Sequence, residues 1–186
     1  MAKSGLSCTF TAILSEIGGT LAQVSAQQVE ALGEAMAQAG AVFTTGEGRS
    51  GLVGRCFAMR LMHLGLKAHV VGEAMAPAVQ ASDLLVAISG SGETAVTCLL
   101  ASQAKKQGAR VAALTAAADS PLAATADVVI LVPAPTKEQA AAASIQHGGS
   151  LFEQSALILL DAIALQLQRR LHQTDEQMRA RHANLE

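Results

Sequence analysis

The sequence predicts an α/β protein, a three-layer αβα sandwich built around a five-stranded parallel sheet. Five short runs rich in Val, Leu, Ile and Ala recur through the middle of the chain, at 41–45, 67–71, 83–88, 110–115 and 128–132. Segments with apolar residues at helical spacing lie between most of them. Strands that are apolar along their whole length are typical of parallel sheets that helices cover on both faces.

The remaining elements are predicted from apolar spacing and from Gly and Pro positions. Two helices are expected before the first strand, at 9–24 and 27–38. Helices at 52–64, 94–107 and 121–125 connect strands, and a loop at 133–149 crosses the sheet edge. A long helix at 151–171 and a tail at 173–186 with one short helix complete the chain.

A single domain is expected over the 186 residues, because domains cluster near roughly 100–150 residues and no linker or repeat divides the chain. Within 1–186, the N-terminal helices occupy 1–39, the α/β core 40–150, and the C-terminal helix and tail 151–186.

Composition excludes several function classes. The net charge is -2, with four Phe and neither Trp nor Tyr, which disfavours binding to nucleic acid through a basic patch or aromatic stacking. Apolar stretches are interrupted well before the roughly 18 residues of a membrane span, and no clean signal peptide is present. We therefore expect a cytoplasmic protein without a membrane partner.

The cysteines are Cys8, Cys56 and Cys98, an odd number without a CxxC spacing. This arrangement predicts neither a disulfide framework nor a zinc site. We expect three small buried hydrophobic residues in a reducing compartment, and no metal site.

A Ser/Gly loop follows the third predicted strand. It offers the hydroxyls of Ser89, Ser91 and Thr94, while Gly90 and Gly92 allow the backbone to approach a ligand closely. Backbone N–H groups beside a helix N-terminus bind anions, so the loop is interpreted as a phosphate cradle. The alternative is a flexible turn in which Thr94 only caps the next helix.

A second polar loop, with Arg49 and Ser50, follows the first predicted strand. Loops at the carboxyl ends of parallel strands meet at one edge of the sheet, which strengthens the prediction of a phosphate site. Neither loop carries a Walker A lysine, and no acidic partner follows a GxGxxG fingerprint. A nucleoside triphosphate or dinucleotide, and hence a nucleotide-dependent oxidoreductase, is disfavoured.

Four motifs together resemble one family. They are GEGRSG with FAMRLMHLG (46–65), DLLVAISGSGET (83–94), GSLFE (149–153) and the terminal RHANLE (181–186). In these motifs the chain resembles the 6-phospho-3-hexuloisomerases, members of the sugar isomerase (SIS) domain superfamily.

The resemblance implies a flavodoxin-like SIS fold and a ketose–ketose isomerase, an intramolecular oxidoreductase acting on a small sugar phosphate. It implies interconversion of 3-hexulose 6-phosphate and fructose 6-phosphate in the ribulose monophosphate pathway of formaldehyde assimilation, on a homotetramer, a dimer being the alternative. Moving a carbonyl between C2 and C3 through an enediolate needs a base with a suitable pKa, and we expect no metal or organic cofactor.

The resemblance also implies catalytic residues. Glu153 is the candidate base, the alternative being a carboxylate that merely stabilises the start of a long helix. His182 is the candidate general acid near the substrate oxygens, in an ordered tail over a neighbouring subunit's site, the alternative being an exposed histidine in a frayed tail.

Other candidates carry open alternatives. Arg49 is expected to contact phosphate or another substrate oxygen through its planar guanidinium. Arg60 contacts substrate or forms an ion pair, and Glu73 contacts a sugar hydroxyl or is an ordinary loop carboxylate. His63 is more typical of a core or interface histidine than of a catalyst.

The chain departs from the family pattern at Glu47, at Ala76 and at His147-Gly148. These departures affect the expected sugar pocket and its charge, so two alternatives stay open. One is an SIS isomerase for a pentose, heptose or amino-sugar phosphate, and the other is a non-catalytic module that senses a sugar phosphate.

Overall fold

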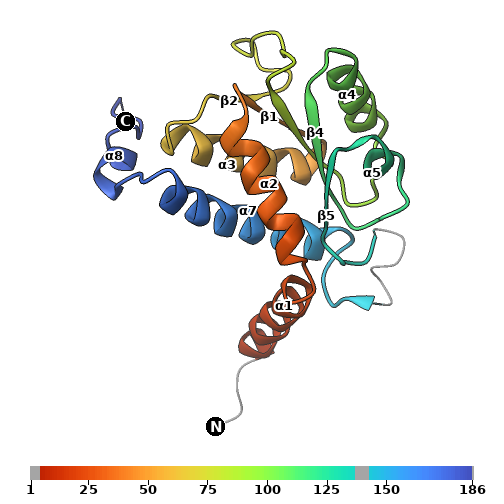
Figure 1. Cartoon of the computed structure of the whole chain (residues 1–186). Coiled ribbons are helices and arrows are strands. Elements are labelled where there is room, and N and C mark those ends of the chain that lie inside the picture. Colours follow the sequence, from red (N-terminus) through yellow and green to blue (C-terminus); the bar gives the residue numbers. More distant parts are fainter. Residues whose placement is uncertain (1–4, 137–142, 186) are drawn as a thin grey trace.

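The computed structural model describes residues 5–136 and 143–185, and its centre is a five-stranded parallel sheet (Figure 1). The strands are β1 (Val42–Gly46), β2 (Ala68–Val70), β3 (Leu84–Ile88), β4 (Arg110–Thr115) and β5 (Val128–Leu131), in the order β2-β1-β3-β4-β5. Every neighbouring pair is parallel. The predicted parallel sheet is confirmed.

Helices cover both faces of this sheet. They are α1 (Gly5–Leu21), α2 (Ala26–Gln38), α3 (Gly48–His63), α4 (Ala95–Lys106), α5 (Pro121–Thr125), α7 (Ser150–Arg170) and α8 (Asp175–Arg179). The predicted helices are all present, the one at 121–125 with the expected ends and the others with shifted ends. The predicted loop at 133–149 includes residues 137–142, which, like residues 1–4 and Glu186, lie outside the described part of the chain.

One boundary differs in a way that matters for the site. The stretch 46–51 was expected to be a tight loop, but α3 already begins at Gly48, so Arg49 and Ser50 lie in the first turn of a helix. A Cβ at Gly51 would overlap with the carbonyl oxygen of Gly46, so the glycine lets the helix start directly against the end of β1.

Alternate residues of the central strands belong to two separate cores. Val86, Ile88 and Leu114 pack with the side chains of α2, α3 and α7 on one face. Leu85 and Ala87 pack with those of α4 and α5 on the other. Since side chains alternate across a strand, the continuous apolar runs follow from burial on both faces, and the three-layer prediction is confirmed.

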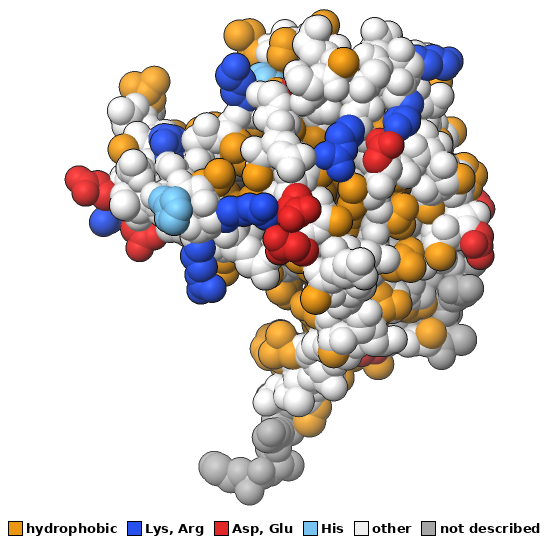
Figure 2. Space-filling view, viewed as in Figure 1, with side chains coloured by type: hydrophobic (Ala, Val, Ile, Leu, Met, Phe, Trp, Pro, Cys, Tyr) orange, Lys and Arg blue, Asp and Glu red, His pale blue; other side chains and the backbone are white. Residues whose placement is uncertain are grey.

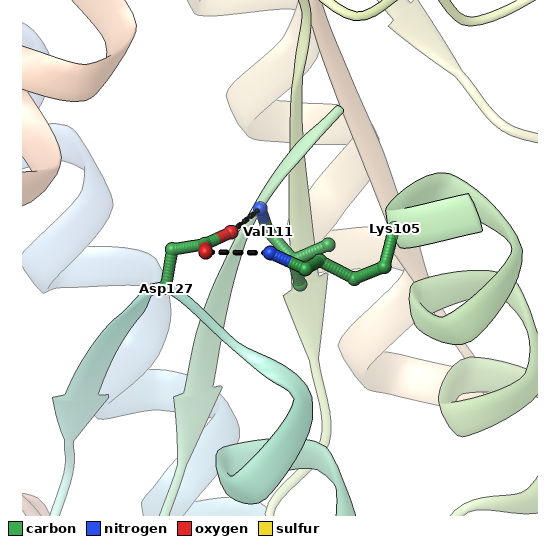
Figure 3. Close-up of polar contacts among 3 residues, drawn as sticks. All are labelled: Lys105, Val111 and Asp127. Atoms are coloured by element: carbon green, nitrogen blue, oxygen red, sulfur yellow. Dashed lines mark hydrogen bonds and ion pairs between the residues drawn. The ribbon is translucent and has the colours of Figure 1, made fainter. Parts of the chain in front are cut away.

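Asp127 fixes the amino end of β5 (Figure 3). Its carboxylate accepts hydrogen bonds from the backbone N–H of Val111 in β4 and from Lys105 Nζ in α4, at 2.8 and 2.6 Å. Burial opposes the charged form, but these hydrogen bonds and the charges of Lys105 and Arg110 hold the pKa of Asp127 below its usual value. One carboxylate therefore joins two strands and a helix at the sheet edge opposite the carboxyl ends of the strands.

By length and composition α7 could cross a membrane, but 56% of its most apolar 18-residue window is buried inside the protein, as expected for a core helix.

Helix α1 projects from the body and carries exposed hydrophobic side chains, Leu6, Phe10 and Leu14 (Figure 2). Their spacing of four residues places them on one face of the helix.

The expectation for the cysteines was wrong. Cys8 and Cys56 are exposed, and Cys98 is half-buried. Cys8 lies on the projecting helix α1 and Cys56 on α3, where solvent-facing positions interrupt the buried stripe.

Candidate active site

The sheet order identifies where a ligand would bind. From β1 the chain crosses to β2 on one side, whereas β3, β4 and β5 follow one another on the other side. In open parallel sheets, ligands bind outside the carboxyl ends of the strands at such a switch point. Here this point lies between β1 and β3, whose following segments contain the two predicted polar loops.

A cavity of about 450 Å³ lies there, within the roughly 300–1,000 Å³ typical of small-molecule sites. Its lining comes from the starts of α3 and α7, from the end of β3 with the loop that leads to α4, and from the segment after β5: residues 47–50, 88–91, Thr94, 135–136, 148–149, Phe152 and Glu153. A larger cavity of about 700 Å³ lies among α3, α7 and α8, but neither polar loop contributes to it.

Three helix N-termini converge on the smaller cavity without side-chain caps. The N-cap residues of α3, α4 and α7 are Glu47, Thr94 and Gly149, and none of them makes a capping hydrogen bond. By contrast, hydroxyls of Ser25, Ser120 and Thr174 cap α2, α5 and α8. Each N-terminus carries roughly half a positive charge and unsatisfied N–H groups, so the three together suit an anion.

Hydroxyl groups stabilise the Ser/Gly loop from within. Ser89 Oγ lies 2.9 Å from Thr94 Oγ1 and accepts a hydrogen bond from Gly92 N at 3.1 Å. Thr94 occupies the N-cap position of α4, but its side chain makes no capping hydrogen bond, contrary to the alternative of a turn in which Thr94 only caps the helix. Ser91 Oγ accepts a hydrogen bond from Glu93 N at 3.2 Å, which leaves its own O–H as a donor.

The two glycines of this loop permit close packing on the cavity walls. Gly92 has a φ of 66°, and a Cβ there would overlap with Ser120 Oγ. A Cβ at Gly90 would lie 3.1 Å from Cδ1 of Phe152, a buried residue of α7. The loop is held between α5 and α7, which fixes the direction of its N–H groups.

Arg49 and Glu153 form an ion pair at the cavity, joining the first turns of α3 and α7. The Glu153 residue is only 8% exposed, whereas the Arg49 side chain is 60% exposed. The contact uses Arg49 Nε, one of the five N–H donors of a guanidinium. The ion pair thereby holds the Glu153 carboxylate in one orientation at the cavity wall.

Two predicted substrate contacts lie elsewhere. Arg60 Nε is 3.7 Å from Asp161 Oδ1, so Arg60 forms the ion pair considered as its alternative. Glu73 Oε1 is 2.5 Å from Arg55 Nη1 and lines cavities beside β2. Neither residue lines the cavity between β1 and β3 within this chain.

His182 also lies away from this cavity within its own chain. Its ring stacks on that of His63, at the C-terminal end of α3, with ring centroids 3.8 Å apart. Arg49 is at the other end of the same helix, about 20 Å away along an axis that rises 1.5 Å per residue. Burial, then the charges of His182 and Arg60, hold the pKa of His63 below its usual value.

The structure brings together most of the predicted binding residues: Arg49, Ser50, Ser89, Gly90, Ser91, Thr94 and Glu153 all line the cavity, and Gly92 supports its wall from behind. Of the family departures, Glu47 and Gly148 line the cavity, whereas Ala76 lies beside Glu73. Within the described residues, no group of three His, Cys, Asp or Glu side chains is placed to hold a metal ion.

Sequence reasoning did not select the walls formed by Pro135, Thr136, Gly149 and Phe152. For Gly149 a signal was present: a glycine pair directly before a long apolar helix suggests a positive φ at the helix start, and its φ is 84°. Phe152 resembles an ordinary core residue in the sequence, and only its contact with Gly90 shows that it also forms part of the cavity wall.

Comparisons with known proteins agree with this geometry. The SIS domain model matches residues 35–158. The chain is 45% identical to 3-hexulose-6-phosphate isomerase of Mycobacterium gastri, over 94% of this chain and 88% of the relative. It is 40% identical to 3-hexulose-6-phosphate isomerase of Bacillus subtilis, over 94% of this chain and 95% of the relative.

A solved structure of a hypothetical protein from Methanococcus jannaschii, inferred to have the molecular function of 3-hexulose-6-phosphate isomerase, matches with a TM-score of 0.84. It is 31% identical, over 96% of this chain and 99% of that one. The resemblance read from the four motifs is thereby confirmed. The chain belongs to the SIS domain family and, within it, to the 3-hexulose-6-phosphate isomerases.

Proposed function

We propose that this protein is an isomerase that interconverts 3-hexulose 6-phosphate and fructose 6-phosphate. The observation that carries the proposal is the position of Glu153, a nearly buried carboxylate in a cavity where three uncapped helix N-termini converge. The helix N-termini suit a phosphate group, and the Glu153 carboxylate can take up and return a proton. Three curated relatives with 40–45% identity carry the name of this activity.

The phosphate would bind at the start of α4, against the Ser/Gly loop. Two carboxylates, Glu47 and Glu153, and one guanidinium, Arg49, line the cavity, so side chains alone do not make it positive. The helix N-termini supply the positive potential, and the hydroxyl of Ser91 adds a hydrogen-bond donor.

The carboxylate of Glu153 would act as the base. It removes the proton from C2 of the 3-hexulose, and the electrons of that C–H bond form the C2–C3 double bond of an enediolate with its negative charge on O3. The same proton is then returned to C3, while the O2 hydroxyl proton passes to O3 and a carbonyl forms at C2. Arg49 orients Glu153 and stabilises the charge on the enediolate oxygens.

A coupled assay tests the activity. The purified protein is supplied with 3-hexulose 6-phosphate, and fructose 6-phosphate is detected through glucose-6-phosphate isomerase and glucose-6-phosphate dehydrogenase. Formation of NADPH at a rate proportional to protein concentration supports the proposal. No product at high protein concentration, while fructose 6-phosphate added to the same mixture is detected, would contradict it.

The same preparation separates the alternatives. An SIS isomerase for a pentose, heptose or amino-sugar phosphate would turn over one of those substrates with a higher kcat/KM than the hexulose. A sugar-phosphate-sensing module would bind fructose 6-phosphate in calorimetry without turnover of any of them.

We further propose that His182 serves the cavity of a second copy of the chain, as the general acid that moves protons between substrate oxygens. The separation of His182 from the cavity along α3 supports this, because a contact within one chain would require the tail to leave His63. The exposed hydrophobic face of α1 also suits a contact between copies. A homotetramer is the proposed assembly, and a dimer is the alternative.

Mixed assemblies test a shared site. Glu153→Gln and His182→Asn chains are each expected to be inactive as uniform assemblies, and to regain part of the activity when coexpressed. In a mixed assembly some cavities combine an intact Glu153 from one chain with an intact His182 from another. If the mixed assembly is no more active than either variant alone, each cavity uses residues of its own chain only. Light scattering gives the number of copies.

In cells, we place this isomerase in the cytoplasm, within the ribulose monophosphate pathway of formaldehyde assimilation. The support is its similarity to the curated 3-hexulose-6-phosphate isomerases, together with the burial of α7 in the core. Expression that follows formaldehyde supply, with the protein in the soluble fraction, is the expected result.

A further inference from the structure

Glu16 is the only charged residue of the 17-residue helix α1, and its carboxylate contacts a distant segment of the chain. Oε2 accepts hydrogen bonds from Ser144 Oγ at 2.8 Å and from Gln146 Nε2 at 2.9 Å. Oε1 accepts one from Ile145 N at 2.9 Å. One side chain thus binds three successive residues that lie about 130 positions later in the sequence.

These contacts favour the charged carboxylate. The hydrogen bond from Gln146, then the backbone N–H of Ile145, then Ser144 hold the pKa of Glu16 below its usual value, although partial burial acts in the opposite direction. Hydrogen bonds to an ionised group are stronger than neutral ones. These three hydrogen bonds, which anchor segment 144–146 to α1, are therefore fully formed at neutral pH.

The anchored segment leads directly into the cavity wall. After Gln146 come Gly148 and Gly149, which both line the cavity, and Gly149 is the uncapped N-cap of α7. In Figure 1 this segment passes beside the inner end of α1 and then enters α7. Ile145 itself is 61% exposed, so its side chain is not buried against the body.

By contrast, α7 has its own means of support. Leu151, Phe152 and Ala156 are buried in the main core within its first two turns. Glu153 is therefore positioned by core packing, and by Arg49, without help from Glu16. Loss of the anchor would alter the wall at 148–149 more than the position of the reacting carboxylate.

We propose that Glu16 is a positioning residue for the sugar-phosphate cavity: it holds segment 144–146, and through it the wall at Gly148 and Gly149, in the conformation that binds substrate. The proposal rests on the proposed function for the identity of the substrate. It assigns to α1 a role in binding, although the described α1 contributes no residue to the cavity lining.

The test combines Glu16→Gln, which keeps the size of the side chain, with Glu16→Asp and Gln146→Ala. Glu16→Gln should raise KM for the hexulose phosphate roughly three- to tenfold, with kcat within about twofold of the unsubstituted protein. Glu16→Asp should recover part of the loss if its shorter carboxylate still reaches Ile145. Glu30→Gln is the matched control, because Glu30 on α2 pairs with Arg170 away from the cavity, and KM should not change.

A double-mutant cycle distinguishes an effect of Glu16 through the anchored segment from a general loss of stability. If Glu16 acts through the anchored segment, Glu16→Gln and Gln146→Ala together should raise KM by clearly less than the product of their single effects. A KM unchanged in Glu16→Gln, an equal increase in Glu30→Gln, or independent effects in the cycle would each overturn the proposal.

Binding of fructose 6-phosphate, measured by calorimetry, separates this proposal from the proposed function. If the unsubstituted protein binds fructose 6-phosphate but does not isomerise the hexulose, the proposed function fails. Glu16 is then tested by the dissociation constant of fructose 6-phosphate, which should rise in Glu16→Gln by a similar factor and stay constant in Glu30→Gln. A constant value in both would overturn the role of Glu16.

Discussion

The imidazole of His182 stacks on that of His63, with ring planes 16° apart, and this contact fixes the C-terminal tail on the end of α3. Arg181 reinforces it by donating hydrogen bonds from Nη1 to the carbonyl oxygen of His63 and to Gln173 Oε1, at 2.9 and 3.0 Å. These contacts give Arg181 and His182 a defined place on the protein.

The stack predicts a dependence of stability on pH. The pKa of His63 is lowered in the folded protein, so the unfolded chain binds more protons as pH falls below about 6.5 and stability decreases. We expect a lower melting temperature at pH 5.5 than at pH 7.5. His63→Phe can stack without taking up a proton and should reduce that difference, whereas His69→Phe should not. The charged and titratable groups that face His63 are His182, Arg60 and Arg181. An equal dependence of the melting temperature on pH in both variants would contradict the prediction.

Glu153→Gln should lower kcat by roughly 10²- to 10⁴-fold, the usual contribution of a general base. KM should stay within about threefold, because the helix N-termini that suit the phosphate are unchanged. Steady-state kinetics in the coupled assay measure both constants. Glu93→Gln is the control, since Glu93 is an exposed carboxylate of the Ser/Gly loop that does not line the cavity. Comparable turnover in Glu153→Gln would remove this residue as the base.

Ser91→Ala tests the phosphate cradle. If the free O–H of Ser91 donates to the phosphate, its loss should cost about 1–2 kcal/mol of binding, or roughly a 5- to 30-fold increase in KM. Ser102→Ala, on the helix that follows the loop, should leave KM unchanged. An unchanged KM in Ser91→Ala would indicate that the hydroxyl only accepts the hydrogen bond from Glu93 N.

Gly92→Ala should destabilise the fold by more than about 2 kcal/mol, because its Cβ would overlap with Ser120 Oγ in addition to the strain of a positive φ. Gly72→Ala is the matched control: its φ is 89°, but no atom lies within 4 Å of a Cβ there, so only about 1 kcal/mol is expected. Urea denaturation measures both. Equal losses would show that Ser120 moves aside at little cost.

Asp127→Asn should lower the free energy of unfolding by about 1 kcal/mol at pH 7, since the amide keeps an acceptor for Val111 N but loses the charge facing Lys105. The folded pKa of Asp127 is depressed, so its contribution is complete above about pH 4 and disappears as pH falls through the folded value. The difference between the two proteins should shrink in acid. Asp119→Asn, at an exposed position, should match the unsubstituted protein at both pH values.

Much of the fold could be predicted from the sequence because burial on both faces leaves continuous apolar runs such as 84–88. The position of the Ser/Gly loop at a cavity was also predictable, since the loop follows directly on the apolar run of β3. The start of α3 was not, because Gly48, Ser50 and Gly51 are poor helix formers and only packing against Gly46 places them in a helix.

The partners of charged residues were harder to predict. Nothing in the spacing of Arg49 and Glu153, 104 positions apart, indicates that they meet, and the same holds for Glu16 and Ser144. Periodicity reports which face of an element is buried, but it carries no information on which charged side chains the tertiary fold brings together.

The convergence of α3, α4 and α7 has a consequence for mutagenesis. Their N-terminal N–H groups belong to the main chain, and apart from proline no substitution removes a peptide N–H. An alanine scan would remove the Glu153 carboxylate but would leave these N–H groups in place, so it would not register what they contribute to anion binding. Side chains around the cavity can therefore change over evolution while this main-chain feature persists.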